Sequence, residues 1–137
     1  MQTPVLAWVA KQEYKGKAMA NAVPAQIHGQ KYLSLITIRK NGTAVYTPVW
    51  FAENGDTIYV MTRNDSGKYK RIRNNPEIRV APCTIRGKVT GPEFPGHARI
   101  LLPEAWVLPR QAIRAKYLLA RLSLFASKKN EYMEITF

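Results

Sequence analysis

The residues most suited to binding or catalysis follow an apolar run that ends at Thr62. They are the segment Asp65-Ser66-Gly67-Lys68. Asp-Ser-Gly is typical of a helix start, and Pro76 predicts the end of a short helix over residues 68–74. A helix N-terminus offers unpaired N–H groups and the positive end of the helix dipole, which together bind phosphate. Thr62 and Ser66 would add hydroxyl groups and Lys68 a positive charge. Simple capping by Asp65 or Ser66, with solvated basic side chains beside it, explains the same residues, and the motif alone leaves both interpretations open.

Other chemistry-bearing residues are sparse in this sequence. Cys83 is the single cysteine, which excludes a disulfide framework within the chain and a zinc site built from several cysteines. His28 and His97 are isolated from each other and from any nucleophile, and such histidines are more typical of surface or structural positions. The pattern shows no nucleophile–base pair and no paired carboxylates on one face.

The charge balance predicts an anionic partner. The 137 residues carry 21 Lys and Arg against 9 Asp and Glu, a net charge of +12, and a field of this sign attracts phosphates, carboxylates or nucleic acid. The densest group of positive charges consists of Arg63, Lys68, Lys70, Arg71 and Arg73.

The N-terminal residues 1–30 are expected to form a helix or arm. Their short apolar run, residues 4–10, lacks the preceding basic segment of a signal peptide, so a cytoplasmic location is expected. No apolar run approaches the roughly 18 residues that a membrane span needs, and no membrane partner is expected.

The elements that must position these residues are mostly strands. Alternating and β-branched patterns predict strands at residues 31–39, 44–52, 57–63, 77–85, 97–102 and 130–136. Asn41-Gly42 and Asn54-Gly55 predict tight hairpin turns, and Pro48 predicts a sheet edge or a bulge. A helix is expected over residues 103–123, kinked or restarted at Pro109. Six strands with little helix suggest a small antiparallel barrel, in a domain covering residues 31–137.

A set of short segments, in a specific order and spacing, carries a family resemblance. The segments are Tyr32-Leu33-Ser34-Leu35, Arg39-Lys40-Asn41-Gly42-Thr43, Thr47-Pro48-Val49-Trp50-Phe51, Ser66-Gly67-Lys68, Arg71-Ile72-Arg73-Asn74-Asn75-Pro76, Val80-Ala81-Pro82-Cys83 and Arg86-Gly87. Together they resemble the pyridoxamine 5′-phosphate oxidase-like, FMN-binding split-barrel superfamily, and most closely its branch of F-420 (deazaflavin)-dependent oxidoreductases.

The resemblance implies a mainly β fold, a six-stranded antiparallel split β-barrel with a few peripheral helices. It also implies a homodimer with two cofactors, F-420 or FMN, at the subunit interface. The strand over Thr47, Pro48, Val49 and Trp50 would lie along the flavin ring. Residues Met61, Thr62, Ser66, Gly67 and Lys68 would take the ribityl chain and phosphate. Ala81, Pro82 and Cys83 would run beside the cofactor, with Cys83 more suited to packing than to chemistry.

The function implied is hydride transfer between reduced F-420 or FMN and an unknown small substrate. The oligoglutamate tail of F-420 would suit a basic groove, for which Lys70, Arg71 and Arg73 are candidates. Residues 132–137 lack the basic side chains that true pyridoxamine-phosphate oxidases direct at their substrate, so that activity is not expected.

Two other functions remain open at this point. A carrier or sensor that binds the cofactor without turnover would have the same sequence features. A small basic barrel that binds nucleic acid ranks third. It would need exposed aromatic side chains, and Tyr32, Tyr46, Trp50 and Tyr59 are interspersed with apolar residues that favour a core.

Overall fold

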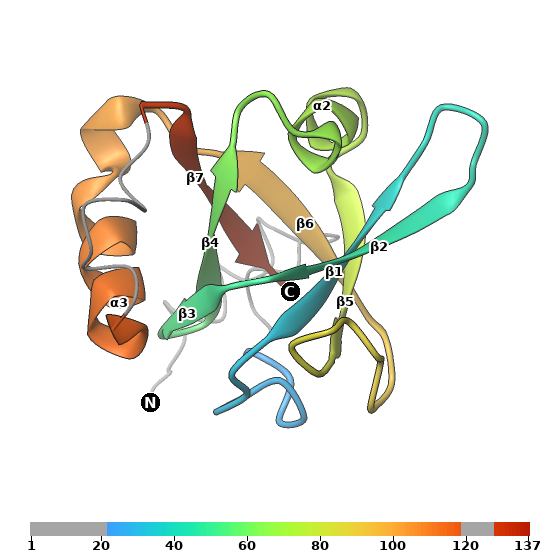
Figure 1. The fold of residues 1–137 in the computed structure, drawn as a ribbon, viewed down its shortest axis with the longest axis horizontal. Coiled ribbons are helices and arrows are strands. Elements are labelled where there is room, and N and C mark those ends of the chain that lie inside the picture. The colour runs from blue at the N-terminus through green and yellow to red at the C-terminus, as the bar shows by residue number, and fades with distance from the viewer. Residues whose placement is uncertain (1–21, 119–127) are drawn as a thin grey trace, which may run out of the picture.

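The computed structural model describes residues 22–118 and 128–137, in which one antiparallel sheet of seven strands curls upon itself (Figure 1). In chain order the elements are β1 (Leu33–Ile38), β2 (Ala44–Val49), β3 (Phe51–Asn54), β4 (Thr57–Arg63), α2 (Gly67–Asn74), β5 (Glu77–Pro82), β6 (Phe94–Ile100), the 3₁₀ turn η2 (Pro103–Ala105), α3 (Val107–Lys116) and β7 (Asn130–Thr136). The strands follow the spatial order β2-β1-β5-β6-β7-β4-β3.

The two ends of this order, β2 and β3, are separated in the sequence by Trp50 alone. The sheet therefore curls until the chain itself connects its two edges, which is the closure of a split β-barrel. The predicted fold class is confirmed, but the predicted number of six strands is wrong. The run 44–52 divides into two strands at Trp50, because its first part pairs with β1 and its second part pairs with β4. Pro48 lies on the edge strand β2, as predicted. Proline has no backbone N–H to donate to a neighbouring strand, and an edge strand has no second neighbour that requires one.

The alternation of side chains separates two apolar clusters. Inward-facing residues from the strands fill the barrel, including Leu33, Leu35, Val49, Phe51, Val60 and Ile135. A second cluster lies on the outer face of β3, β4 and β7, where Ile113 and Tyr117 at the α3 end pack against Ala52, Tyr59 and Tyr132. In Figure 1, α3 correspondingly covers the side of the barrel that carries β3 and β4.

Both predicted hairpin turns are confirmed. Gly42 has φ 90° and Gly55 has φ 62°, the left-handed region that glycine adopts without a Cβ penalty. The first turn connects β1 to β2 and the second connects β3 to β4. These turns fix the register of the two hairpins that carry Thr47–Trp50 and Met61.

The predicted helix over residues 103–123 is replaced by η2 and α3. Pro109 lies in the first turn of α3, where the lack of an N–H costs little, so the helix restarts rather than kinks. The helix ends at Lys116 because Tyr117 takes an extended conformation, with φ −119° and ψ 114°, that directs its ring into the second cluster. Residues 119–123 of the prediction lie outside the described residues.

Most of the expected N-terminal arm, residues 1–21, also lies outside the described residues. Residues 25–29 form turns, and Ile27 is fully buried in the barrel core. The division into an arm and a domain at residue 31 stays a prediction. No helix in the described ranges has the length and apolar character needed to cross a membrane.

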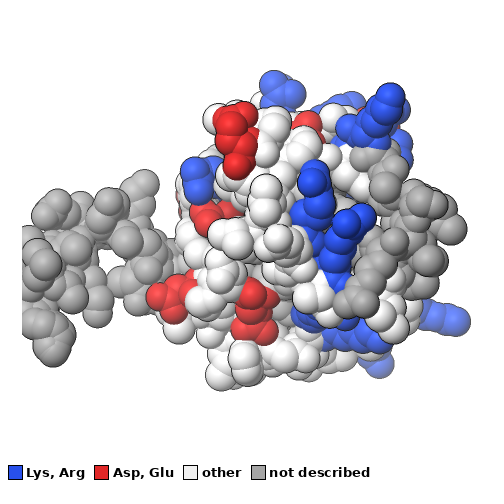
Figure 2. Space-filling model, turned by 90° about the vertical axis from the view of Figure 1, so that its left-hand side faces the viewer, with Lys and Arg blue, Asp and Glu red and all other residues white. Residues whose placement is uncertain are grey.

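Charge is unevenly distributed on the surface. Figure 2 shows the side of the molecule that carries α3, where Lys and Arg side chains gather apart from most Asp and Glu side chains. The acidic groups that pair with cations do so locally, for example Glu93 with Arg79 at 2.6 Å and Glu134 with Arg99 at 2.9 Å. Lys68 and Arg71 have no acidic partner among the described residues, and both bear on the candidate site.

Candidate functional site

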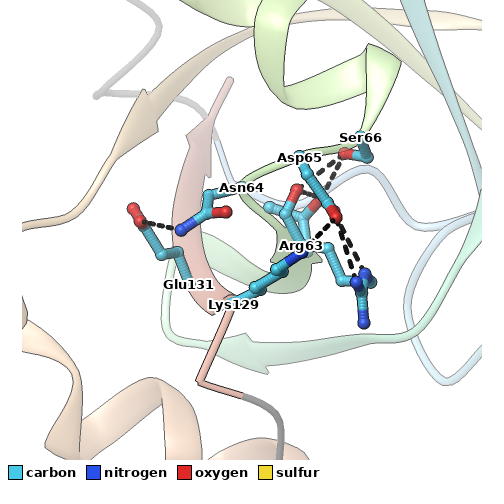
Figure 3. Close-up of polar contacts among 7 residues, drawn as sticks. Arg63, Asn64, Asp65, Ser66, Lys129 and Glu131 are labelled. Atoms are coloured by element: carbon cyan, nitrogen blue, oxygen red, sulfur yellow. Dashed lines mark hydrogen bonds and ion pairs between the residues drawn. The ribbon is translucent and has the colours of Figure 1, made fainter.

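The connection from β4 to α2 is held in place by a network of polar contacts (Figure 3). Arg63 donates to both carboxylate oxygens of Asp65, at 3.1 and 3.0 Å, and the Lys129 ammonium lies 3.2 Å from the same carboxylate. These partners hold the pKa of Asp65 well below its usual range. Asn64 donates to Glu131 of β7 at 3.1 Å. These contacts with Lys129 and Glu131 hold the loop before α2 against the start of β7, and they require no ligand.

Ser66 caps α2. Its hydroxyl oxygen accepts from the Tyr69 backbone N–H at 3.3 Å, and its hydroxyl donates to the Arg63 carbonyl at 2.8 Å. The capping interpretation is thus correct for Ser66 and wrong for Asp65. No acceptor within the described residues pairs with the backbone N–H groups of Gly67 and Lys68. These two donors stay available at the positive end of the helix.

A pocket of about 250 Å³ opens beside this helix start. It is lined by Pro48, Val49, Trp50, Met61 and Lys68. Three of these residues come from the passage of β2 into β3, one comes from β4 and one from α2. All five belong to the residues that sequence reasoning assigned to the cofactor, although they span 21 positions of the chain. The fold brings them together because β3, which follows β2 directly after Trp50, pairs with β4, and β4 leads into α2.

Tyr117 stacks on Trp50, one of the residues that line the pocket. The two rings stack with centroids 4.6 Å apart and planes 5° from parallel. The Tyr117 hydroxyl lies 2.6 Å from the Lys31 carbonyl and 2.9 Å from the Phe51 carbonyl, and accepts from the Phe51 N–H at 3.0 Å. Burial raises the pKa of Tyr117 to about 12. Tyr117 therefore packs against Trp50 and anchors the backbone of Lys31 and Phe51, and no signal in the sequence pattern indicates these backbone contacts.

Lys68 is the positive charge of this pocket. Its side chain is partly buried, and burial, followed by the nearby Arg71 guanidinium, lowers the pKa of Lys68. No acidic group within the described residues pairs with it. A partly buried cation without a counter-ion is a group that a bound anion would stabilise.

The remaining predicted site residues fall into three groups. Thr62, Ser66 and Gly67 adjoin the pocket at the start of α2, with the Thr62 and Ser66 hydroxyl oxygens 3.2 Å apart. Thr47 lies on β2 across from Leu35 of β1.

Ala81, Pro82 and Cys83 do not line the pocket, because β1 lies between their strand and β2. Ser34 of β1 pairs with Pro48 on one side and with Ala81 on the other. Burial raises the pKa of the Cys83 thiol, as expected for a packing residue.

The two histidines lie outside the pocket. His28 contacts Glu53 at 2.7 Å and His97 contacts Glu77 at 2.8 Å, and both pairs are at the surface. Within residues 22–118 and 128–137, no group of three or more His, Cys, Asp or Glu residues is arranged to hold a metal ion.

A second pocket, of about 390 Å³, lies where the end of β1 meets α2. Its lining consists of Ile38, Arg39, Lys40, Arg71 and Asn74. Of the three residues expected to form a basic groove, only Arg71 contributes, whereas Lys70 and Arg73 are exposed elsewhere on α2. Sequence reasoning missed Arg39 and Lys40, although two cations directly after a buried strand were the available signal.

Comparison with known proteins identifies the family. A family model described as pyridoxamine 5′-phosphate oxidase matches residues 19–131, which is most of the chain. The chain belongs to this family. A comparison of its sequence with curated proteins finds no match.

Several solved structures share the fold of this chain at low sequence identity. A conserved hypothetical protein from Mycobacterium tuberculosis is 20% identical, with a TM-score of 0.64 over 85% of this chain and 82% of that one. A protein named F420 reductase is 18% identical, with a TM-score of 0.60 over 83% of this chain and 94% of that one. The heme storage protein HutZ from Vibrio cholerae is 12% identical, with a TM-score of 0.61 over 79% of this chain and 82% of that one. At these identities the likeness shows the fold, and the ligand must be argued from this chain's own residues.

Proposed function

We propose that this protein binds a phosphorylated flavin or deazaflavin, FMN or F-420, in the pocket between β2, β4 and α2. In this proposal it acts as an oxidoreductase that transfers hydride between the reduced cofactor and a small substrate. The observation that carries the proposal is the pocket lined by Pro48, Val49, Trp50, Met61 and Lys68. Residues that the family pattern associates with a flavin, distant in sequence, form one cavity here.

The residues present fit such a group. Lys68, which has no acidic partner among the described residues, and the two N–H groups at the start of α2 would hold the phosphate. Pro48, Val49 and Trp50 would lie along the ring system, and Met61 would exclude water from its other side. When bound, the flavin or deazaflavin supplies the hydride chemistry, for which this pocket offers no side chain of its own. The chain's contribution is to bind, to orient and to keep the pocket dry.

The edge position of the pocket supports a homodimer. Pro48, which lines it, is exposed on an edge strand. In this proposal a second copy of the chain covers that edge and completes the site.

The proposal is tested by titrating the purified protein with FMN and with F-420, following the fluorescence of each compound. Saturable binding of either compound, weakened when Met61 or Lys68 is replaced, supports the site. If neither compound binds at concentrations up to the millimolar range, the proposal is wrong. A turnover assay with reduced cofactor and a panel of small acceptors then separates an oxidoreductase from a carrier or sensor.

Heme is a weaker candidate for this chain, although HutZ is named for it. His28 and His97 are engaged with Glu53 and Glu77 at the surface, and neither lines the pocket. An imidazole ligand from the described residues is therefore not available at this site.

A further inference from the structure

The second pocket contains a group of cations that the proposed flavin site does not use. Arg39 and Lys40 follow β1, and Arg71 lies on α2 one turn after Lys68. Arg71 connects the two pockets, because it lines the second pocket and its charge lowers the pKa of Lys68 in the first. Positive groups thus continue from Lys68 through Arg71 to Arg39.

One hydrogen bond positions the Arg71 side chain, and its guanidinium lies close to Gly67. Its Nε donates to the Thr37 hydroxyl at 2.6 Å, and Thr37 is fully buried on β1. A Cβ placed on Gly67 would lie 2.7 Å from Arg71 Nη1, so the guanidinium folds back over the first turn of α2. Within the described residues no acceptor is recorded for the other four N–H donors of this group. The fold therefore holds Arg71 in place and leaves most of its hydrogen-bonding capacity available.

The charges of the protein itself disfavour this arrangement of cations. Burial and the neighbouring Arg39 both lower the pKa of Arg71, the first more than the second. No carboxylate in the described ranges pairs with Arg39, Lys40 or Arg71, whereas Arg63, Arg79 and Arg99 each have an acidic partner. Adjacent cations without counter-ions repel one another, and an anion bound between them would relieve that repulsion.

We propose that Arg39, Lys40 and Arg71 form a second anion subsite, which binds a further carboxylate or phosphate group of the ligand whose first phosphate lies at Lys68. This inference rests on the proposed function for the position of that first phosphate. The ligand class is a cofactor with an anionic extension, such as the oligoglutamate tail of F-420 or the second phosphate of FAD. FMN, which has one phosphate, would leave the subsite empty.

The test compares affinities for FMN, FAD and F-420 by fluorescence titration in the wild type and in three variants. Arg71→Gln and Arg39→Gln remove charges of the subsite. Arg73→Gln removes the same charge from an exposed position of α2 and is the matched control. We expect the wild type to bind F-420 or FAD at least about fivefold more tightly than FMN. Arg39→Gln should abolish this preference and leave the affinity for FMN unchanged. Arg71→Gln should abolish the preference as well, whereas Arg73→Gln should retain it.

The tighter-bound compound identifies the source of the second anion. Equal affinity for all three compounds, or an equal loss of affinity for all three in Arg71→Gln, would overturn the subsite while leaving the flavin site in place. If none of the compounds binds, the proposed function is wrong. The subsite is then tested by the melting temperature of the protein with and without free γ-linked tetraglutamate. A rise in melting temperature in the wild type and in Arg73→Gln, absent in Arg39→Gln, would support it, and no rise in the wild type would exclude it.

Discussion

Lys68 is the residue on which the proposed cofactor site depends most directly. Replacing it with alanine should weaken FMN or F-420 binding at least several-fold, because a charge-assisted hydrogen bond to phosphate contributes about 1.5–3 kcal/mol. Lys70→Ala, two positions along α2 and exposed, is the control for the loss of one positive charge. Fluorescence titration measures both variants. An unchanged affinity in Lys68→Ala would remove this lysine from the site.

Tyr117 is a single residue whose contribution to the free energy of unfolding can be measured. Tyr117→Phe leaves the Phe51 N–H without its acceptor, which should lower the free energy of unfolding at pH 7 by about 1–3 kcal/mol. The pKa of Tyr117 is raised to about 12, so folding favours its protonated form. The stabilisation is complete below the ordinary pKa of about 10 and is lost as the pH rises through the folded-state value.

The difference in unfolding free energy between the wild type and Tyr117→Phe should therefore narrow from pH 10 to pH 12. Urea denaturation followed by tryptophan fluorescence measures it. Tyr46→Phe, at an exposed ring that contacts Glu93, should match the wild type at pH 7. A constant difference between pH 8 and pH 12 would show that Tyr117 is not the group whose ionisation is coupled to folding.

At the scale of elements, α2 depends on its cap and β1 carries an unsatisfied hydroxyl. Ser66→Ala removes the acceptor of the Tyr69 N–H and should cost about 1 kcal/mol of unfolding free energy. Ser34 is fully buried, and its hydroxyl has no hydrogen-bond partner among residues 22–118 and 128–137. Ser34→Ala should therefore leave the stability unchanged or raise it by up to about 1 kcal/mol. The two variants make the same chemical change, and denaturation midpoints that fall equally in both would contradict this account.

Local signals were sufficient for much of the fold and failed where distant contacts decide. The strands over residues 57–63 and 130–136 match the sequence prediction because alternation and turn residues specify them locally. The break at Trp50 was missed, since it arises from pairing with two different strands rather than from a turn residue. The early end of α3 was missed for a similar reason, because the backbone contacts of Tyr117 override a helical pattern.

The candidate site was predictable to the extent that a family pattern covers it. The segments around Pro48 and Lys68 are recognisable in the sequence, and the structure places them in one pocket. The family pattern also assigns Ala81–Cys83 to the cofactor site. These residues do not line this pocket, because β1 lies between β5 and β2. Arg39 was overlooked, because its proximity to Arg71 follows from the way α2 packs on the end of β1.

At the scale of the whole molecule, the expected assembly is a homodimer. Multi-angle light scattering during size-exclusion chromatography should give about twice the mass of the 15.6 kDa chain. We further expect Pro48→Arg, on the exposed edge strand, to shift the protein toward the monomer and to weaken cofactor binding. A single-chain mass in the presence of saturating cofactor would contradict a site completed by a second copy.

The junction at Trp50 also bears on how this protein can diversify. Val49 and Phe51 face the barrel interior, while Trp50 and Ala52 pack outside it, so the alternation runs through the junction without interruption. Inserting or deleting one residue there would exchange the two faces for every later position of the strand. The hairpin tip at Asn41-Gly42, which is exposed, has no such constraint. Length variation among natural homologues should therefore accumulate at that tip, whereas the spacing from Pro48 to Phe51 should be invariant even where the side chains differ.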